Sequence, residues 1–201
     1  MDWEIYKSLL PEGISIAAGL DEAGRGPLFG SVYAAAVILP EGYIPEGLDD
    51  SKKLTEKKRE KLYDIIIRDA VSWGIGICTP KEIDEINILN AALLAMKRAV
   101  ENMAIQPEYL FVDGNVFRGF DIAGQSVVGG DAKIPQIAAA SILAKVSRDR
   151  YCLEMDEKYP QYGLKKHKGY PTKEHYAAIL ENGPSPLHRM SFLKKLYGES
   201  K

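Results

Sequence analysis

Short apolar runs that end in polar or glycine-rich turns predict five β-strands. The first run contains β-branched residues, the second is apolar after Ser31, the third alternates, and the fourth is apolar throughout. Continuous apolar runs of this length are typical of strands that other elements cover on both faces. We expect the strands at residues 15–20, 31–39, 71–78 and 109–112, with the fifth near 126–128.

Apolar residues at helical spacing occupy most of the chain between and after these strands. In residues 55–70, leucine and isoleucine recur on one side and charged residues on the other. Thr79, Pro80 and Glu82 predict a helix start, because the threonine caps, the proline suits the first turn and the glutamate can reach back. Further helices are expected at residues 89–103, 134–159 and 172–181, with a short one closing the chain.

The order of these elements predicts the α/β class, with a mixed sheet covered on both faces. The sequence contains no internal repeat, low-complexity tract or linker-like stretch, so we expect one domain over residues 1–201. Within it, we expect a core at about residues 14–160 and a basic helical C-terminal region at about residues 161–201, packed against one end.

Composition narrows the class of protein. A chain of 201 residues with 46% hydrophobic and 27% charged residues can bury a core without disulfides or a structural metal. Cys78 and Cys152 show no paired spacing, which favours a reducing, cytoplasmic location. The residues after Met1 lack the pattern of a signal peptide, and no apolar run approaches ~18 residues, so no membrane contact is expected.

The charge is divided unevenly along the chain. Residues 1–132 carry 13 Lys and Arg against 21 Asp and Glu, whereas residues 133–201 carry 13 against 7. Chance and solvated helix faces would explain this division. It is equally consistent with an acidic metal site in the first part and a surface for a polyanion in the second.

Four acidic residues lie at predicted strand ends or helix starts. Asp21 and Glu22 follow the first strand, Asp113 ends the fourth, and Asp131 precedes a helix. Strand ends that meet at one edge of an open sheet are where α/β proteins build their sites. Taken singly, each acid is more often a turn or cap residue. The adjacent Asp84 and Glu85, inside a helical segment, are interpreted as solvated.

Electrostatics gives a reason to treat the four acids together. Two like charges about 4 Å apart repel by roughly 4 kcal/mol at an effective dielectric near 20. Protons or cations must therefore compensate such a cluster. Ligands that are all carboxylates suit Mg²⁺ or Mn²⁺. Two such ions can activate water and stabilise the leaving oxygen in phosphodiester hydrolysis.

A glycine-flanked arginine follows the first two acids. Gly24 and Gly26 allow close backbone approach, so the amides around Arg25 can bind a sugar or a phosphate. The alternative is a tight turn in which Arg25 pairs with a nearby acid.

Two basic segments add candidate phosphate contacts. Ser51, Lys52 and Lys53 precede a helix and can hold phosphates, or they are a cap and exposed charges. Lys168 and Tyr170 belong to a segment that interleaves cations with an aromatic ring, which suits a nucleic-acid backbone. A solvated basic loop is the alternative for the second segment.

Two arginines and three histidines remain among the polar residues considered. Arg148 and Arg150 are interpreted as surface residues or phosphate contacts. His188 is expected to be structural, and no role is assigned to His167 or His175.

Taken in order, six segments resemble bacterial ribonuclease HII, the type 2 RNase H family. They run from about residue 18 to residue 192, nearly the whole chain. Only about 14 residues precede the first strand, so the N-terminal substrate-binding domain typical of ribonuclease HIII is not expected. The segments are GLDEAGRGPLFG with SVYAAAVILP, DDSKKL, FVDGN, GDAKIPQIAAASILAKVSRDR, HKGYPTKEHY and GPSPLHRMSF.

The resemblance implies the RNase H-like fold, with a five-stranded mixed sheet flanked by helices and a helical C-terminal region that contacts the substrate. It implies that the loop of Gly24, Arg25 and Gly26 recognises the ribose 2′-hydroxyl and that Tyr170 packs on that ribose. It also implies two Mg²⁺ or Mn²⁺ ions bound by the four acids; the sequence does not decide between these metals. The acids are Asp21, Glu22, Asp113 and Asp131.

The activity implied is an endoribonuclease that hydrolyses the RNA strand of RNA/DNA hybrids. Such enzymes also nick 5′ of single ribonucleotides embedded in duplex DNA, leaving 3′-hydroxyl and 5′-phosphate ends. A monomer is expected. Leu193, Leu196 and Tyr197 resemble only part of a peptide that binds a sliding clamp. The alternatives are another RNase H-like nuclease such as a DNA-cutting resolvase, a non-catalytic nucleic-acid-binding module, or a small-molecule phosphatase.

Overall fold

Five strands form one mixed sheet in the order β3-β2-β1-β4-β5 in this computed structural model, which describes residues 1–198. The central β1 pairs antiparallel with β2 and parallel with β4. At the two edges, β3 is antiparallel to β2 and β5 is parallel to β4. The strands are β1 (Ala17–Ala23), β2 (Val32–Ile38), β3 (Ser72–Cys78), β4 (Tyr109–Asp113) and β5 (Gly124–Val127).

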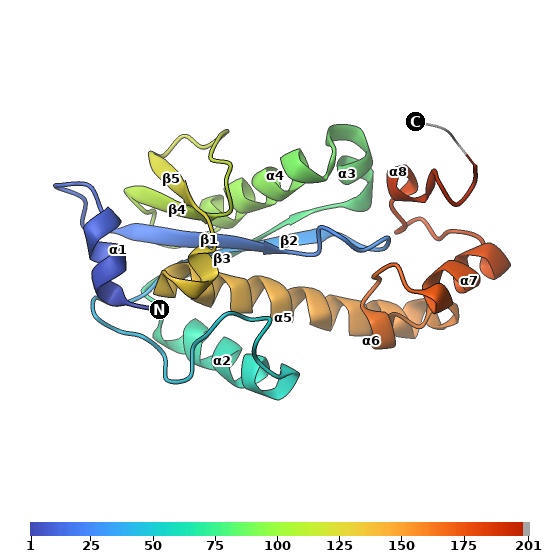
Figure 1. Ribbon diagram of the computed structural model, residues 1–201, viewed down its shortest axis with the longest axis horizontal. Helices are drawn as coiled ribbons and strands as arrows, with labels where there is room; N and C mark the ends of the chain where they lie inside the picture. Colours follow the sequence, from blue (N-terminus) through green and yellow to red (C-terminus); the bar gives the residue numbers. More distant parts are fainter. Residues whose placement is uncertain (199–201) are drawn as a thin grey trace.

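Helices cover both faces of this sheet. One face packs against α4, and the other packs against the long α5, which α2 covers in turn (Figure 1). The helices are α1 (Trp3–Leu9), α2 (Glu56–Asp69), α3 (Pro80–Ile86), α4 (Ile88–Glu101), α5 (Pro135–Lys158), α6 (Leu164–His167), α7 (Lys173–Asn182) and α8 (Met190–Leu193), with short 3₁₀ turns η1 (Gly130–Ala132) and η2 (Pro160–Tyr162).

Small residues let the covering helices approach the sheet closely. A Cβ atom at Gly76 of β3 would overlap the carbonyl oxygen of Ala95 in α4, and one at Gly19 of β1 would overlap the backbone of α5 at Gln136. All seven residues of β2 are buried, as its unbroken apolar run predicted.

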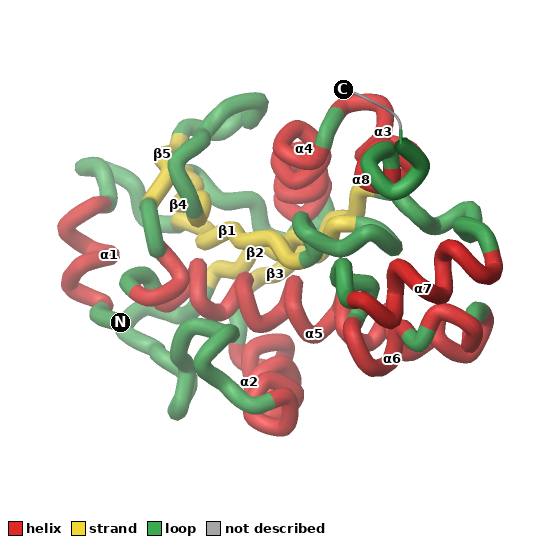
Figure 2. Tube along the Cα trace, turned by 45° about the vertical axis from the view of Figure 1, so that its right-hand side comes forward, coloured by secondary structure: helices red, strands yellow, loops and turns green. Residues whose placement is uncertain are grey.

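The C-terminal region forms a separate apolar cluster beyond one end of the sheet. Figure 2 shows α6 and α7 beside the last turns of α5 and α8 beside α3, all beyond the end of the strands. Its buried members include Phe29, Tyr162, Leu164, Ile179 and Leu193. Phe29 comes from the loop between β1 and β2, so this cluster fixes that loop against the C-terminal helices. The predicted region extends to residue 201, and residues 199–201 lie outside the described chain.

The predicted elements are confirmed with shifts of a few residues at their ends, except in β1. The prediction ended that strand at Leu20, whereas β1 continues to Ala23 because Asp21 and Glu22 still pair with β2. These two acids therefore lie inside a strand and do not follow it. The sequence pattern also did not indicate α1, which adds Trp3 and Tyr6 to the core.

Gly76→Ala is expected to lower the free energy of unfolding by about 2 kcal/mol or more, because overpacking against fixed backbone costs ~1–3 kcal/mol. Urea denaturation measures this free energy. Ile77→Ala on the same strand is the control, because Ile77 is 39% exposed and surface substitutions change stability by about 0.5 kcal/mol. Equal effects of the two substitutions would contradict the close approach of α4.

Candidate active site

The register of two parallel strands brings Asp21 and Asp113 together. Leu20 of β1 pairs with Val112 of β4, and each acid is the next residue on its own strand. Asp21 is buried, and its carboxylate accepts a hydrogen bond from the Glu22 amide at 2.7 Å. Burial first, and then the charges of Glu22 and Asp113, raise the pKa of Asp21 well above its ordinary value, although a hydrogen bond from Ser141 opposes this.

Asp131 reaches the same edge from the turn after β5. Gly129 adopts φ of 63°, in the left-handed region that glycine favours, and so turns the chain into η1. The amides of Gly130 and Asp131 then donate to Asp113 Oδ1, at 2.7 and 3.4 Å. Burial and the neighbouring Asp131 charge raise the pKa of Asp113.

Two cationic side chains partly neutralise this cluster. Lys52 Nζ lies 3.3 Å from Asp131 Oδ2, and Arg25 lies 3.3 Å from Glu22 Oε1. Burial opposes the charged form of Lys52, but the charges of Asp131 and Asp21 raise its pKa overall. Burial also raises the pKa of Glu22, and Arg25 opposes that shift. The ion pair of Arg25 is the one expected for the tight-turn alternative.

The donor set is suited to hard divalent cations, because all four side chains offer carboxylate oxygens. In the orientations of the described residues, 1–198, no three His, Cys, Asp or Glu side chains converge on a single ion position. Glu22 and Asp131 turn toward Arg25 and Lys52 instead. The backbone thus brings the four acids to one edge of the sheet, while two of their carboxylates face cationic side chains.

The loop after β1 meets the C-terminal region beside this cluster. Gly24 has φ of 96°, and Arg25 and Gly26 are exposed. A Cβ atom at Gly26 would lie 3.4 Å from the ring of Tyr170, so that ring packs against the loop while remaining 41% exposed. The residues predicted to contact the ribose are therefore adjacent, although they lie far apart in the sequence.

The buried Arg189 fixes this loop by hydrogen bonds to its backbone. The sequence analysis did not predict this role. Arg189 donates from Nε to the carbonyl of Gly30, from one terminal nitrogen to that of Arg25 and from the other to that of Gly24, at 2.7–3.0 Å. Burial lowers the pKa of Arg189 to about 9, which leaves it charged at neutral pH. Its position in a loop gave no periodic pattern that would have marked it as buried.

Arg148 supports the same region from α5. It donates to the carbonyls of Lys168 and Phe29, and its guanidinium lies 5.8 Å from the centre of the Tyr170 ring. The surface interpretation of Arg148 is wrong, because its side chain is buried. Its helical spacing from the apolar residues Ala144 and Cys152 could have indicated this.

The four predicted phosphate-binding residues fall into different surroundings. Ser51 is buried and hydrogen-bonded to Ser141 Oγ at 2.9 Å, which places it beside the acids with Lys52. Lys53 faces Asp49 at 3.5 Å. Lys168 donates to the Lys165 carbonyl at 3.0 Å, and its own carbonyl accepts from Arg148.

Asp84, Arg150 and Leu193 each contact another element of the fold. Asp84 is not merely solvated, because it accepts hydrogen bonds from the amides of Met190 and Ser191 at the start of α8. Arg150 is a surface residue, the first of its two interpretations, and pairs with Glu60 on α2. In the tail, Leu193 is buried in the C-terminal cluster.

The strand order and the helices on both faces define an RNase H-like fold, and the acids on β1, on β4 and after β5 give it an acidic centre. In solved structures, the chain is similar to ribonuclease H2 from Pyrococcus horikoshii OT3, with a TM-score of 0.74 and 28% identity over 92% of this chain and 100% of that one. It is also similar to the ribonuclease HII of a PCNA complex from Archaeoglobus fulgidus, with a TM-score of 0.69 and 25% identity over 88% of this chain and 94% of that one.

Sequence comparison identifies the family. The family model of ribonuclease HII matches residues 18–195. The chain is 56% identical to the ribonuclease HII of Acetivibrio thermocellus, over 94% of this chain and 73% of that protein. It is 50% identical to that of Caldicellulosiruptor bescii, over 96% and 94% of the two chains. The chain belongs to the ribonuclease HII family, and that membership makes it an endoribonuclease. In residues 1–198, no helix is long and apolar enough to cross a membrane.

Arg189→Lys is expected to lower the free energy of unfolding by about 2–4 kcal/mol and to reduce cleavage activity. Lysine keeps the charge but cannot donate to three carbonyl groups in the fork geometry of arginine, and each hydrogen bond from a charged group contributes roughly 1.5–3 kcal/mol. Thermal denaturation and initial cleavage rates measure the two effects. Arg68→Lys, at an exposed position, is the control. If the Arg189 variant were as stable and active as that control, the guanidinium would not be needed to fix the loop.

Proposed function

We propose that the chain hydrolyses the RNA strand of RNA/DNA hybrids and nicks duplex DNA on the 5′ side of single embedded ribonucleotides, leaving 3′-hydroxyl and 5′-phosphate ends. Family membership supports the endoribonuclease class. The observation that carries the finer proposal is the contact between Gly26 and Tyr170. It places a partly exposed aromatic ring against the loop that follows Asp21 and Glu22.

The four acids are the proposed ligands of two divalent cations, Mg²⁺ or Mn²⁺. When bound, these cations would generate a nucleophilic water and stabilise the leaving oxygen. Burial and neighbouring carboxylates raise the pKa values of Asp21, Glu22 and Asp113, and bound cations would offset both effects, which supports this role. Release of Glu22 from Arg25 and of Asp131 from Lys52 would free both carboxylates to act as ligands and both cations to contact phosphate.

Selection of a ribonucleotide is assigned to the loop of Gly24, Arg25 and Gly26 together with Tyr170. RNA and DNA differ locally by one hydroxyl group, so polar backbone groups beside the reacting phosphate must detect it. A site built to hydrogen-bond that hydroxyl rejects the deoxy sugar, because its own polar groups would be left unpaired. The fixation of this loop by Arg189 supports the assignment, since a loop that moved could not discriminate.

Binding of the duplex backbone is assigned to Ser51, Lys52, Lys53 and Lys168. Lys52 and Lys53 are exposed and precede α2, whereas Lys168 lies next to the ribose-recognition residues. Contacts of this kind are independent of sequence, so duplex affinity should fall steeply as salt rises. The buried Ser51 would act through Lys52, whose backbone position it fixes by its hydrogen bond to Ser141.

The decisive experiment is Mg²⁺-dependent cleavage of a DNA duplex that contains one ribonucleotide, with the cut position mapped. Asp113→Asn is expected to abolish cleavage and to keep or raise duplex affinity, because it removes a ligand charge without changing side-chain size. Asp121→Asn is the matched control at an exposed position. Cutting of all-DNA substrates would favour a resolvase, hydrolysis of only a phosphomonoester would favour a phosphatase, and binding without cleavage would favour a binding module.

Tyr170→Ala is expected to reduce discrimination between the single-ribonucleotide duplex and an all-DNA duplex by about 10- to 100-fold, because stacking on an aromatic ring contributes ~1–3 kcal/mol. The ratio of kcat/KM values on the two substrates measures this effect. Tyr197→Ala is the control, because Tyr197 is similarly exposed in the C-terminal region. An equal loss on both substrates would mean that Tyr170 has a structural role only.

A further inference from the structure

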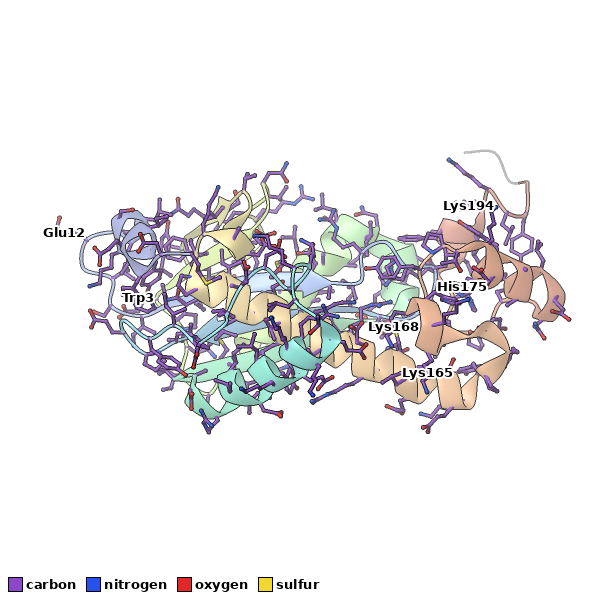
Figure 3. The ribbon with its side chains drawn as sticks, turned by 60° about the horizontal axis from the view of Figure 1, so that its bottom comes forward. Trp3, Glu12, Lys165, Lys168, His175 and Lys194 are labelled. Carbon is purple, nitrogen blue, oxygen red and sulfur yellow. The ribbon has the colours of Figure 1, made fainter. Side chains whose placement is uncertain are left out.

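Three histidines, His167, His175 and His188, form a cluster next to the backbone of Tyr170. His175 on α7 and His188 before α8 are buried, and their Nε2 atoms are 3.2 Å apart. The ring of His167, at the end of α6, stacks on that of His175 with 4.4 Å between ring centres. Figure 3 shows His175 inside the C-terminal helical region, between the labelled Lys168 and Lys194.

The hydrogen-bond partners allow one arrangement of protons on the buried pair. His175 Nδ1 lies 3.0 Å from the carbonyl oxygen of Tyr170, which can only accept, so this nitrogen carries the proton. The amide of Ser185 donates to His188 Nδ1 at 2.9 Å, so that nitrogen is an acceptor. His188 must then donate from Nε2 to the bare Nε2 of His175.

Both rings must be neutral for this arrangement to hold. A proton added to either ring would place two N–H groups face to face or leave the Ser185 amide without an acceptor. Burial lowers the pKa of each histidine to about 4, and a neighbouring histidine adds to the shift in both cases. The other polar side chains that face the pair are Tyr162, whose ring contacts both, and the Ser185 hydroxyl. Within residues 1–198, no carboxylate forms an ion pair with either ring.

The pair is connected directly to the backbone of Tyr170. That residue's carbonyl accepts from His175 and from the Thr172 amide, and its own amide donates to the carbonyl of His167. The peptide groups on both sides of the residue are therefore fixed, while the ring stays free to face Gly26 and the solvent.

The same pair also contacts the loop that recognises the ribose. His188 forms a backbone bridge with Phe29, and the two rings pack edge to face at 5.0 Å. The neighbouring Leu28 amide donates to the carbonyl of Gly169, one residue before Tyr170. The histidines thus lie where the loop, the Tyr170 segment and the start of α8 meet.

We propose that His175, held as its neutral Nδ1–H form by His188, is a positioning residue that sets Tyr170 against the loop of Gly24–Gly26 and so determines ribonucleotide discrimination. This rests on the proposed function of Tyr170. His175 does not contact the substrate; it acts through the Tyr170 carbonyl.

A pair of substitutions of equal size separates this role from packing. Asparagine at position 175 keeps an N–H donor near the position of Nδ1, whereas leucine has the same size and no donor. His175→Asn is expected to retain most of the discrimination between ribonucleotide and all-DNA duplexes, and His175→Leu to lose about tenfold, the cost of one hydrogen bond near the upper end of its range. Ile179→Ala, a buried change one turn along α7, should lower stability but leave the ratio unchanged.

Tyr170→Ala distinguishes the positioning role of His175 from the proposed role of Tyr170 itself. If His175 acts through Tyr170, the double variant His175→Leu/Tyr170→Ala should discriminate no worse than Tyr170→Ala alone. Equal discrimination by the Asn and Leu variants, or additive losses in the double variant, would overturn the positioning role. If Tyr170→Ala itself leaves discrimination unchanged, the proposed function of Tyr170 fails instead.

Nitrogen NMR of the wild-type histidine rings tests the proton arrangement without any substitution. We expect His175 protonated on Nδ1 and His188 on Nε2, with neither ring titrating until the pH approaches about 4. Because the folded-state pKa lies below the ordinary value of 6.5, the pair favours folding above that pH, and its contribution is lost as the pH falls toward 4. A ring of His175 that titrates near 6.5, or carries its proton on Nε2, would overturn the inference.

Discussion

The parallel pairing of β1 with β4 is the constraint on which the rest of the site depends. Its register places Asp21 beside Asp113, and the amides of η1 then bring Asp131 to the same position. Like charges at such a spacing, partly removed from water, are unfavourable unless cations compensate them. The strand pairing is stable because the sheet is buried between α4 and α5, so packing elsewhere offsets an arrangement of acids that is unfavourable by itself.

A second set of buried charges, opposite in sign, supports the loop of Gly24, Arg25 and Gly26. Arg189 and Arg148 donate to main-chain carbonyls of the loop and of the Tyr170 segment. Both come from the basic C-terminal part of the sequence, so the uneven charge distribution is not confined to solvated helix faces. Guanidinium groups suit this task because one planar group can fix several carbonyls and still favour an anion at the outer surface of the loop.

Local patterns in the sequence predicted most of the elements, because the periods of buried strands and amphipathic helices are independent of their partners. Predictions failed where a partner decides the outcome. The apolar run of β1 stops at Leu20, yet pairing with β2 carries the strand through the acids to Ala23. Asp84 resembles a solvated helix residue until α8 supplies its donors. Position and chemistry marked the four acids as candidates, but their approach to one another depends on the β1–β4 register, which no local pattern contains.

The neutrality of the histidines follows from their burial and from their hydrogen-bond partners. An imidazolium at either position would be a buried positive charge with no carboxylate paired to it among the described residues. Neutral rings avoid that cost and still supply a directed donor and acceptor at each end. Each nitrogen of His175 and His188 has a complementary hydrogen-bond partner. The pair can therefore hold the Tyr170 carbonyl in place without adding a charge near the loop of Gly24, Arg25 and Gly26. The arginines therefore supply both hydrogen bonds and charge, whereas the proposed positioning by the histidines adds hydrogen bonds without charge.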